Sequence, residues 1–314
     1  MSEHPAWPAL PFEPWAETCT TLHLWTQIVG KIRVARAPWQ NHSWHVPLYL
    51  TSRGLTTSPV PLGHGALQVD LDLIGHRLSV TTSRGAASEF ALEPMPVADF
   101  YGRVMDALDS VGAPTRIHDR PNEVESPIPF AEDREHGAYD AEAVERFFRV
   151  LTTVDGVFKR FRARFLGKCS PVHFFWGSFD HAVTRFSGRP APEHPGGIPN
   201  LPDWITREAY SHEVSSAGFW PGGAAFPAPL FYSYAYPTPE GFAEREVRPA
   251  ATTWNSDLGE FVLEYEAVRT SDEPDATLMA FLEDTYRAAA ETAGWDRSSL
   301  EWDPSSVPRE YRSR

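Results

Sequence analysis

The order in which helical and strand-like segments follow one another is the feature that most constrains the fold. Residues 21–36 carry apolar side chains at spacings of three and four, and the segment that begins at Asp140 does the same. Short runs rich in β-branched and aromatic residues follow each helical segment, and each half ends with a second helical pattern closed by Gly112 or Gly294. We therefore predict an α+β fold with two helix–strands–helix halves and largely antiparallel sheets packed into one unit.

Changes in composition set the boundaries of these halves. The predicted segments are a proline- and aromatic-rich arm at 1–20, a first half at 21–112, a linker at 113–139, a second half at 140–295 and a tail at 296–314. The predicted strands are 44–51, 66–73, 77–82, 89–93, 172–178, 210–216, 230–236 and 260–265. Because the linker contains apolar and aromatic residues besides proline and charge, we expect it to pack along the surface.

A shift of 128 positions suggests that the two halves form an internal repeat. Without a gap, the shift aligns Lys31 with Lys159, Arg36 with Arg164, His45 with His173, and Thr56 with Thr184. Few identities support the repeat, so chance similarity is the alternative. If the repeat is real, the two sheets pack about a pseudo-twofold axis and a site lies between them.

Charge and cysteine content exclude several classes of protein. The 42 acidic residues outnumber the 28 basic ones, and the net charge of −14 would repel a phosphate backbone, so we expect no nucleic-acid partner. Cys19 and Cys169 are too few for a disulfide framework and are predicted to be reduced thiols. No apolar segment is long enough to span a bilayer, so we expect a cytoplasmic protein without a membrane partner.

Three runs of sequence resemble one bacterial family. They are residues 22–31 (LHLWTQIVGK), 173–180 (HFFWGSFD) and 211–216 (SHEVSS). Over nearly its whole length the chain is similar to the family catalogued as domain of unknown function 5996. The resemblance implies that the chain is one unit, and it implies no activity, cofactor or catalytic residue.

Three histidines on separate predicted strands are candidates for a shared site. His45, His173 and His212, with one carboxylate, would suit Zn²⁺, Fe²⁺ or Mn²⁺, so a divalent transition metal is one candidate cofactor. The alternative without a metal is acid–base chemistry, and a core histidine satisfied by the backbone is the common structural explanation for any one of them. The candidate catalytic residues are His173, His212, Asp180, Tyr210 and Glu213.

A second group of residues is expected to bind the substrate. Arg185 and Arg189 follow Asp180 in a segment predicted to reach the end of a sheet, where they could clamp a carboxylate or phosphate. A salt bridge from Asp180 to either arginine is the structural alternative. The 29 prolines and 11 tryptophans fit rigid aromatic pocket walls. The other candidate binding residues are Lys31, Gln27, Trp176, Trp220, Asn122 and Glu123.

No sequence signature of a nucleotide-binding, α/β-hydrolase or thioredoxin-like protein is present. The leading hypothesis is an enzyme that acts on a small polar or anionic molecule at a histidine-centred site between the halves. The principal alternative is a non-catalytic small-molecule binding protein or sensor. A third hypothesis is an interaction scaffold that uses the arm at 1–20.

Overall fold

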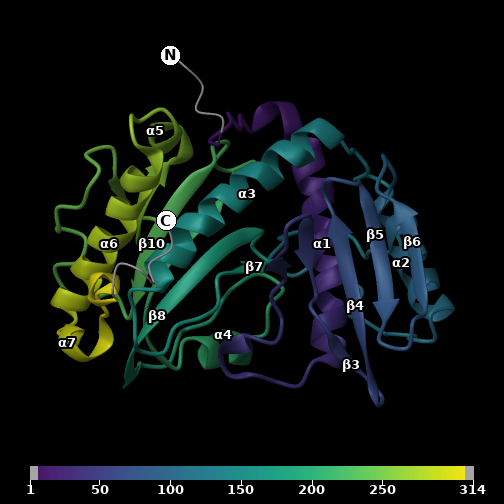
Figure 1. The fold of residues 1–314 in the computed structure, drawn as a ribbon, viewed down its shortest axis with the longest axis horizontal. Helices are drawn as coiled ribbons and strands as arrows, with labels where there is room; N and C mark the ends of the chain where they lie inside the picture. Colours follow the sequence, from purple (N-terminus) through teal and green to yellow (C-terminus); the bar gives the residue numbers. More distant parts are fainter. Residues whose placement is uncertain (1–5, 308–314) are drawn as a thin grey trace.

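Two antiparallel sheets and the helices that cover them make up the computed structural model, which describes residues 6–307. Each sheet has six strands, and the predicted α+β class is confirmed (Figure 1). The first five residues of the predicted arm and residues 308–314 of the predicted tail lie outside the described residues. No helix within residues 6–307 is both long and apolar enough to cross a membrane.

The first sheet lies between α1 (Ala16–Arg36) and α2 (Val97–Ser110) in the sequence. Its strands are β1 (Tyr49–Leu50), β2 (Gly54–Thr56), β3 (Val60–Leu62), β4 (Gly65–Asp72), β5 (Arg77–Thr82) and β6 (Ala87–Ala91). They are ordered β1-β2-β4-β5-β6, with β3 also paired to β4. Every second residue of β4 is a buried apolar side chain, and α1 and α2 pack against this sheet.

The second sheet follows α3 (Ala141–Arg162), whose N-terminus is capped by the Asp140 carboxylate, as the sequence indicated. The strands are β7 (His173–Phe175), β8 (Asp180–Pro190), β9 (His212–Trp220), β10 (Leu230–Tyr236), β11 (Thr253–Asn255) and β12 (Glu260–Glu264). Their order is β7-β8-β9-β10-β12-β11. The remaining helices are α4 (Asp203–Ala209), α5 (Tyr265–Arg269), α6 (Pro274–Thr292) and α7 (Arg297–Leu300). Helices α3 and α6 pack against each other and cover one face of this sheet (Figure 1).

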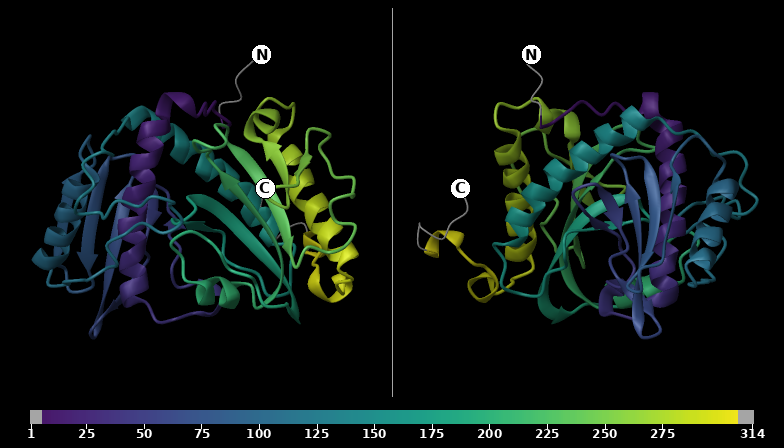
Figure 2. Two further views of the ribbon diagram at one scale, coloured as in Figure 1. Left: turned by 180° about the vertical axis from the view of Figure 1, so that it is seen from behind. Right: turned by 45° about the vertical axis from the view of Figure 1, so that its right-hand side comes forward.

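The two sheets meet edge to edge. Leu48, just before β1, and Phe174 of β7 exchange two backbone hydrogen bonds of 2.9 and 2.8 Å. Beside them, the indole Nε1 of Trp176 donates to the carbonyl oxygen of Val46 at 2.8 Å. Helix α1 stands at this junction (Figure 2). The two halves are therefore connected by backbone hydrogen bonds between strand edges as well as by the linker.

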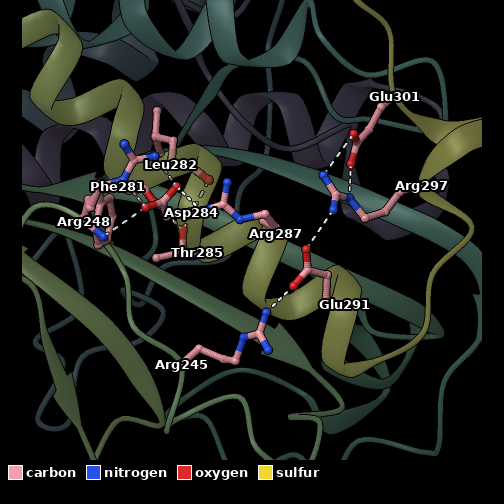
Figure 3. A network of polar contacts seen from close by, with 10 residues as sticks. All are labelled: Arg245, Arg248, Phe281, Leu282, Asp284, Thr285, Arg287, Glu291, Arg297 and Glu301. Carbon is pink, nitrogen blue, oxygen red and sulfur yellow. Dashed lines mark hydrogen bonds and ion pairs between the residues drawn. The ribbon is translucent and has the colours of Figure 1, made fainter.

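Polar contacts join the C-terminal helices to the connection between β10 and β11 and join the arm to α6. The buried Asp284 carboxylate of α6 accepts hydrogen bonds from Arg248 at 2.7 and 2.9 Å and from Arg287 at 2.6 Å (Figure 3). A second network joins Arg245, Glu291, Arg297 and Glu301. In the arm, Trp7 is fully buried and donates to Asp275 at 2.9 Å. These contacts hold the helical face of the second sheet, which leaves its other face for the site.

The structure corrects the predicted secondary structure at two places near the site. Residues 44–51 were expected to form a strand, but only Tyr49–Leu50 does, because the 3₁₀ turn η2 (Asn41–Ser43) holds His42 and Ser43 at φ values of 58° and 56°. Residues 180–190 were not among the predicted strands but form β8. His45 therefore lies in a turn whereas His173 lies in β7. Both halves have the order helix, sheet, helix, while the repeat at a shift of 128 positions stays a prediction.

Candidate functional site

A cavity of about 940 Å³ lies on the face of the second sheet opposite α3 and α6. Strand alternation gives β8 two different faces. Asp180, Ala182 and Thr184 line the cavity, whereas His181 bonds to Asp155 of α3 and Arg185 stacks on Phe161 of α3. The volume is within the range of small-molecule sites in proteins. We regard this cavity as the candidate functional site.

The walls of the cavity come from both halves and from the linker. The floor is formed by β8, β9 and β10, and the sides are formed by α1, by the turn around η2, by the linker and by the connection that contains α4. At the mouth, Trp39 and Trp204 are 48% and 56% exposed, and their ring centroids are 5.2 Å apart. The cavity therefore has a polar, tyrosine-rich floor and an apolar mouth.

Contacts of the linker backbone place Glu123 in the cavity wall. The Asn122 N–H donates to Gln27 Oε1 at 2.8 Å, and Gln27 Nε2 donates back to the Asn122 carbonyl at 2.9 Å. Glu123 itself has a φ of 59°, a left-handed conformation that is costly for a residue with a Cβ. Its carboxylate lies against Gly177, where a methyl group would overlap Oε1. The two hydrogen bonds of the Gln27 amide thus fix the position of the linker backbone next to Glu123.

The Glu123 carboxyl group is partly buried and has no hydrogen-bond partner within the described residues. Among residues 6–307 no side chain or backbone group forms a hydrogen bond with its oxygens, and its accessible surface faces the cavity. Burial, followed by the charge of Asp180, raises the pKa of Glu123 to about 7. The group can therefore be protonated or ionised near neutral pH.

Asp180, at the start of β8, is held by two hydroxyl groups. The Ser178 hydroxyl donates to Oδ1 and the Tyr232 hydroxyl donates to Oδ2. Burial raises the pKa of Asp180 in spite of these two hydrogen bonds. Tyr232 reaches Asp180 by lying across β9 at Gly218, where a methyl group would overlap the tyrosine ring. Gly218 is therefore required by the close approach of an aromatic ring.

The other polar groups of the floor are bonded to one another. The hydroxyls of Tyr210 and Tyr234 are 2.7 Å apart, and those of Thr184 and Ser216 are 2.8 Å apart. Burial raises the pKa of both tyrosines, so their hydroxyls stay neutral. These pairs shape the floor and leave Glu123 as the acidic group free to interact.

Lys31 of α1 lines the cavity next to the linker. It is buried, and its Nζ donates to Asn122 Oδ1 and lies 5.5 Å from the ring centroid of Trp176. Burial lowers the pKa of Lys31 to about 8, against the attraction of Asp119. Trp176 packs closely on α1 because Gly30 has no side chain, and a methyl group there would overlap the indole. The Lys31 ammonium group is therefore hydrogen-bonded to the side-chain amide of Asn122 in the linker.

The three predicted histidines do not form a common centre. His45 lines the cavity beside Trp39, with ring centroids 4.5 Å apart, and its Nδ1 accepts the Gln40 N–H at 3.3 Å. His173 is fully buried outside the lining, its two ring nitrogens have no partner, and burial lowers its pKa to about 3. His212 lies beside His42, also outside the lining. No group of three His, Cys, Asp or Glu side chains within residues 6–307 could hold a metal ion, so these histidines do not build the predicted metal site.

The predicted arginine clamp is also absent from the cavity. Arg185 is on the helical face of β8, 3.4 Å from the ring centroid of Phe161, because its position alternates with those of Asp180 and Thr184. Arg189 instead pairs with Glu213 at 2.7 Å and donates to the carbonyl of Ala293 at 2.6 Å. Asp180 bonds to hydroxyl groups, so the alternative of a salt bridge to either arginine is wrong as well.

The cavity brings together about half of the residues singled out from the sequence. Lining residues among them are Lys31, His45, Asn122, Glu123, Trp176, Asp180 and Tyr210. Residues that do not line it are Gln27, His173, Arg185, Arg189, His212, Glu213 and Trp220. Tyr232 and Tyr234 were missed, although their alternation in the predicted strand 230–236 places them on one face. Trp39 and Trp204, the exposed pair at the mouth, do not belong to a predicted strand, so no alternation pattern indicated their position.

The fold and cavity define an α+β protein with two antiparallel sheets and a cavity lined by residues of both halves and of the linker. Residues 7–302 match the model of a family described as a family of unknown function (DUF5996), and the chain belongs to this family. No curated protein and no solved structure matches the chain.

Proposed function

We propose that this chain is an enzyme that acts on a small molecule bound in the cavity, with Glu123 as the group that transfers a proton. The observation that carries the proposal is the Glu123 carboxyl group, which faces the cavity, has no partner within the described residues and has a pKa of about 7. A general acid or base is most effective when its pKa is near the working pH. Perturbed carboxyl groups in cavities are also typical of functional sites.

In this proposal the protein is still an enzyme, but the group that transfers the proton is the carboxyl group of Glu123 and not a histidine. His45 is the one member of the predicted histidine set that lines the cavity. Asp180 and Tyr232 are bonded to each other, so their role would be to position the substrate, and Asp180 also raises the pKa of Glu123. In this arrangement proton transfer belongs to Glu123, and Asp180 is a positioning residue.

A non-catalytic binding protein is the second candidate. It is favoured by the mutual bonding of Tyr210 with Tyr234 and of Thr184 with Ser216, because a floor of saturated groups can orient a ligand without reacting with it. Under this alternative Glu123 contributes affinity alone.

Turnover of a metabolite mixture would separate the two functions. The purified protein is incubated with pooled small metabolites, and mass spectrometry follows both retention on the protein and conversion to products. We expect conversion by the wild type and retention without conversion by Glu123→Gln, which keeps the shape of the side chain and loses the ionisable group. Val34→Trp should abolish both, since Val34 lines the cavity from an exposed position of α1.

Thr20→Trp is the matched control for the blocking variant because Thr20 is exposed on the same helix outside the cavity. It should behave as the wild type. Retention without conversion by the wild type would establish the binding protein instead. Conversion that persists in Glu123→Gln would refute the assigned role of Glu123.

A further inference from the structure

We infer that the ligand of this cavity is an organic cation, with a protonated nitrogen facing Glu123 and Asp180 and an apolar body between the aromatic side chains of the mouth. The inference rests on the proposed function in one respect, namely that the cavity binds a small molecule. It differs from the sequence-based expectation of a polar or anionic substrate, which depended on an arginine clamp that lies outside the cavity.

The charges that line the cavity are distributed unevenly. Glu123 in the linker wall and Asp180 at the floor both line the cavity, and within residues 6–307 neither forms an ion pair. Arg116, His118 and Arg120 belong to the linker and are exposed at the rim. Within the described residues, the lining of the cavity therefore has two carboxyl groups that are not paired with a cation.

The buried basic groups of the lining are engaged elsewhere. Lys31 donates to Asn122 Oδ1. The His42 ring bonds to the Ala209 carbonyl at 2.9 Å and to Lys168 Nζ. The His45 ring accepts the N–H of Gln40, and burial lowers its pKa, which favours the neutral form. None of these groups supplies the counter-charge that the floor lacks.

A protonated nitrogen would meet the electrostatic need of the floor. Burying an unpaired carboxylate is costly, and an ammonium or amidinium group would offset that cost by pairing with Glu123. The rings of Tyr232, Tyr234 and Phe175 also line this part of the cavity and can attract a cation through their π faces. A ligand carboxylate or phosphate would instead meet Asp180 and Glu123 as like charges.

The mouth of the cavity fits an apolar body. Its apolar lining residues include Val34, Trp39, Ile117, Leu201, Trp204 and Ile205. Trp39 and Trp204 are large exposed apolar side chains, and exposure of adjacent apolar surface commonly marks a binding site. A bipartite cavity of this kind selects a ligand with a charged end and an aromatic or aliphatic end.

Three matched probes test the inference by isothermal titration calorimetry at physiological ionic strength. They are 2-(1-naphthyl)ethylamine, 2-(1-naphthyl)ethanol and 1-naphthylacetate, which share an apolar body and differ in the charge of the head. We expect the amine to bind at least tenfold more tightly than the carboxylate, with the alcohol between them. Glu123→Gln should weaken the amine about tenfold and change the alcohol less than twofold, because a charge-assisted hydrogen bond is lost for the amine alone.

Proton release provides a second readout that a merely structural role of Glu123 would not produce. Asp180 on β8 and Tyr210 after α4 interact electrostatically with Glu123, and Glu260 on β12 interacts with Asp180. On α1, Lys31 bonds to the neighbouring Asn122, and His23 bonds to the carbonyl of Gly177, against which Glu123 lies. A bound cation lowers the pKa of Glu123, so titrations at pH 7 in buffers of different ionisation enthalpy should report release of about half a proton for each amine bound. Glu123→Gln should reduce this release, and the alcohol should cause none.

The outcomes separate the inference from the proposed function. Tighter binding of the carboxylate than of the amine would overturn the inference and leave the cavity as a binding site. Amine binding that is unchanged by Val34→Trp would place the amine outside the cavity and would overturn the inference as well. If none of the three probes binds in the millimolar range, the inferred ligand class is refuted, whereas conversion in the metabolite assay would still support the enzyme.

Discussion

Acid should destabilise this protein through His173 in particular, and a substitution at that residue should remove the effect. His173 is fully buried, its two ring nitrogens have no partner, and burial lowers its pKa from 6.5 to about 3. Below pH 6.5 the unfolded chain binds a proton at this imidazole and the folded chain does not. Stability should therefore fall by about 1.4 kcal/mol per pH unit from this group, and by about 2 kcal/mol at pH 5.

Urea denaturation followed by tryptophan fluorescence at pH 8, 6.5 and 5 measures this contribution. His173→Phe keeps an aromatic ring beside Tyr49 and Phe175 and cannot be protonated. The variant should gain about 2 kcal/mol relative to the wild type between pH 8 and pH 5. At pH 8 it should differ by about 1 kcal/mol or less, because the imidazole nitrogens form no hydrogen bond that phenylalanine would lose.

The comparison between variant and wild type isolates His173 from groups that titrate in the same range. Glu123 and Glu260, whose pKa burial raises to about 7, bind protons more readily in the folded state and so favour folding as the pH falls. Their contribution is the same in both proteins and cancels. His64→Phe, at an exposed turn position, is the control for the histidine-to-phenylalanine replacement itself. Parallel curves for His173→Phe and the wild type would refute the reasoning.

Three further predictions concern close packing and ion pairing. Gly30→Ala and Gly102→Ala, both within helices, should change the free energy of unfolding in opposite directions, as thermal unfolding can measure. The methyl group at position 30 overlaps Trp176 and should cost about 1–3 kcal/mol. The methyl group at position 102 meets open space and should add up to about 1 kcal/mol of stability. Gly218→Ala should displace Tyr232 from Asp180 at a cost of about 1.5–3 kcal/mol, and an unchanged melting temperature would contradict this. Asp284→Ala should cost about 1.5–3 kcal/mol, because charge-assisted hydrogen bonds from Arg248 and Arg287 to the buried carboxylate are lost, whereas Glu93→Ala, which removes an exposed ion pair with Arg103, should cost about 1 kcal/mol or less.

Local sequence patterns were sufficient for most of the helices and strands. The Asp140 cap and the alternation of residues 230–236 depend on contacts between near neighbours, and both were read correctly. β8 was missed because Asp180, His181, Arg185 and Arg189 make it polar on both faces. The structure explains the polarity: one face meets the cavity, and the arginine on the other face is covered by Phe161 and Tyr286.

The candidate site was less accessible to sequence reasoning because its geometry depends on contacts between distant residues. Glu123 reaches the cavity through the amide of Gln27, which lies 95 positions from Asn122 in the sequence. No local pattern indicates that a linker glutamate rests on Gly177. Conversely, the histidines attracted attention by residue type, and the structure uses His173 as a core side chain. Residue type alone therefore pointed to the histidines, whereas long-range packing determines which reactive side chains line the cavity.

The linker between the halves also supplies the carboxyl group of the cavity, and this limits how the chain can vary. In most proteins a connecting segment tolerates insertions and deletions, because it only has to span a distance. Here one residue added between Ala113 and Asn122 would move Glu123 out of register with Gly177, or would break the amide pair with Gln27. A break in the chain within this segment would likewise remove a covalent connection that helps to hold Glu123 between Gln27 of the first half and Gly177 of the second half. The length of the linker is therefore fixed by where it must present one side chain.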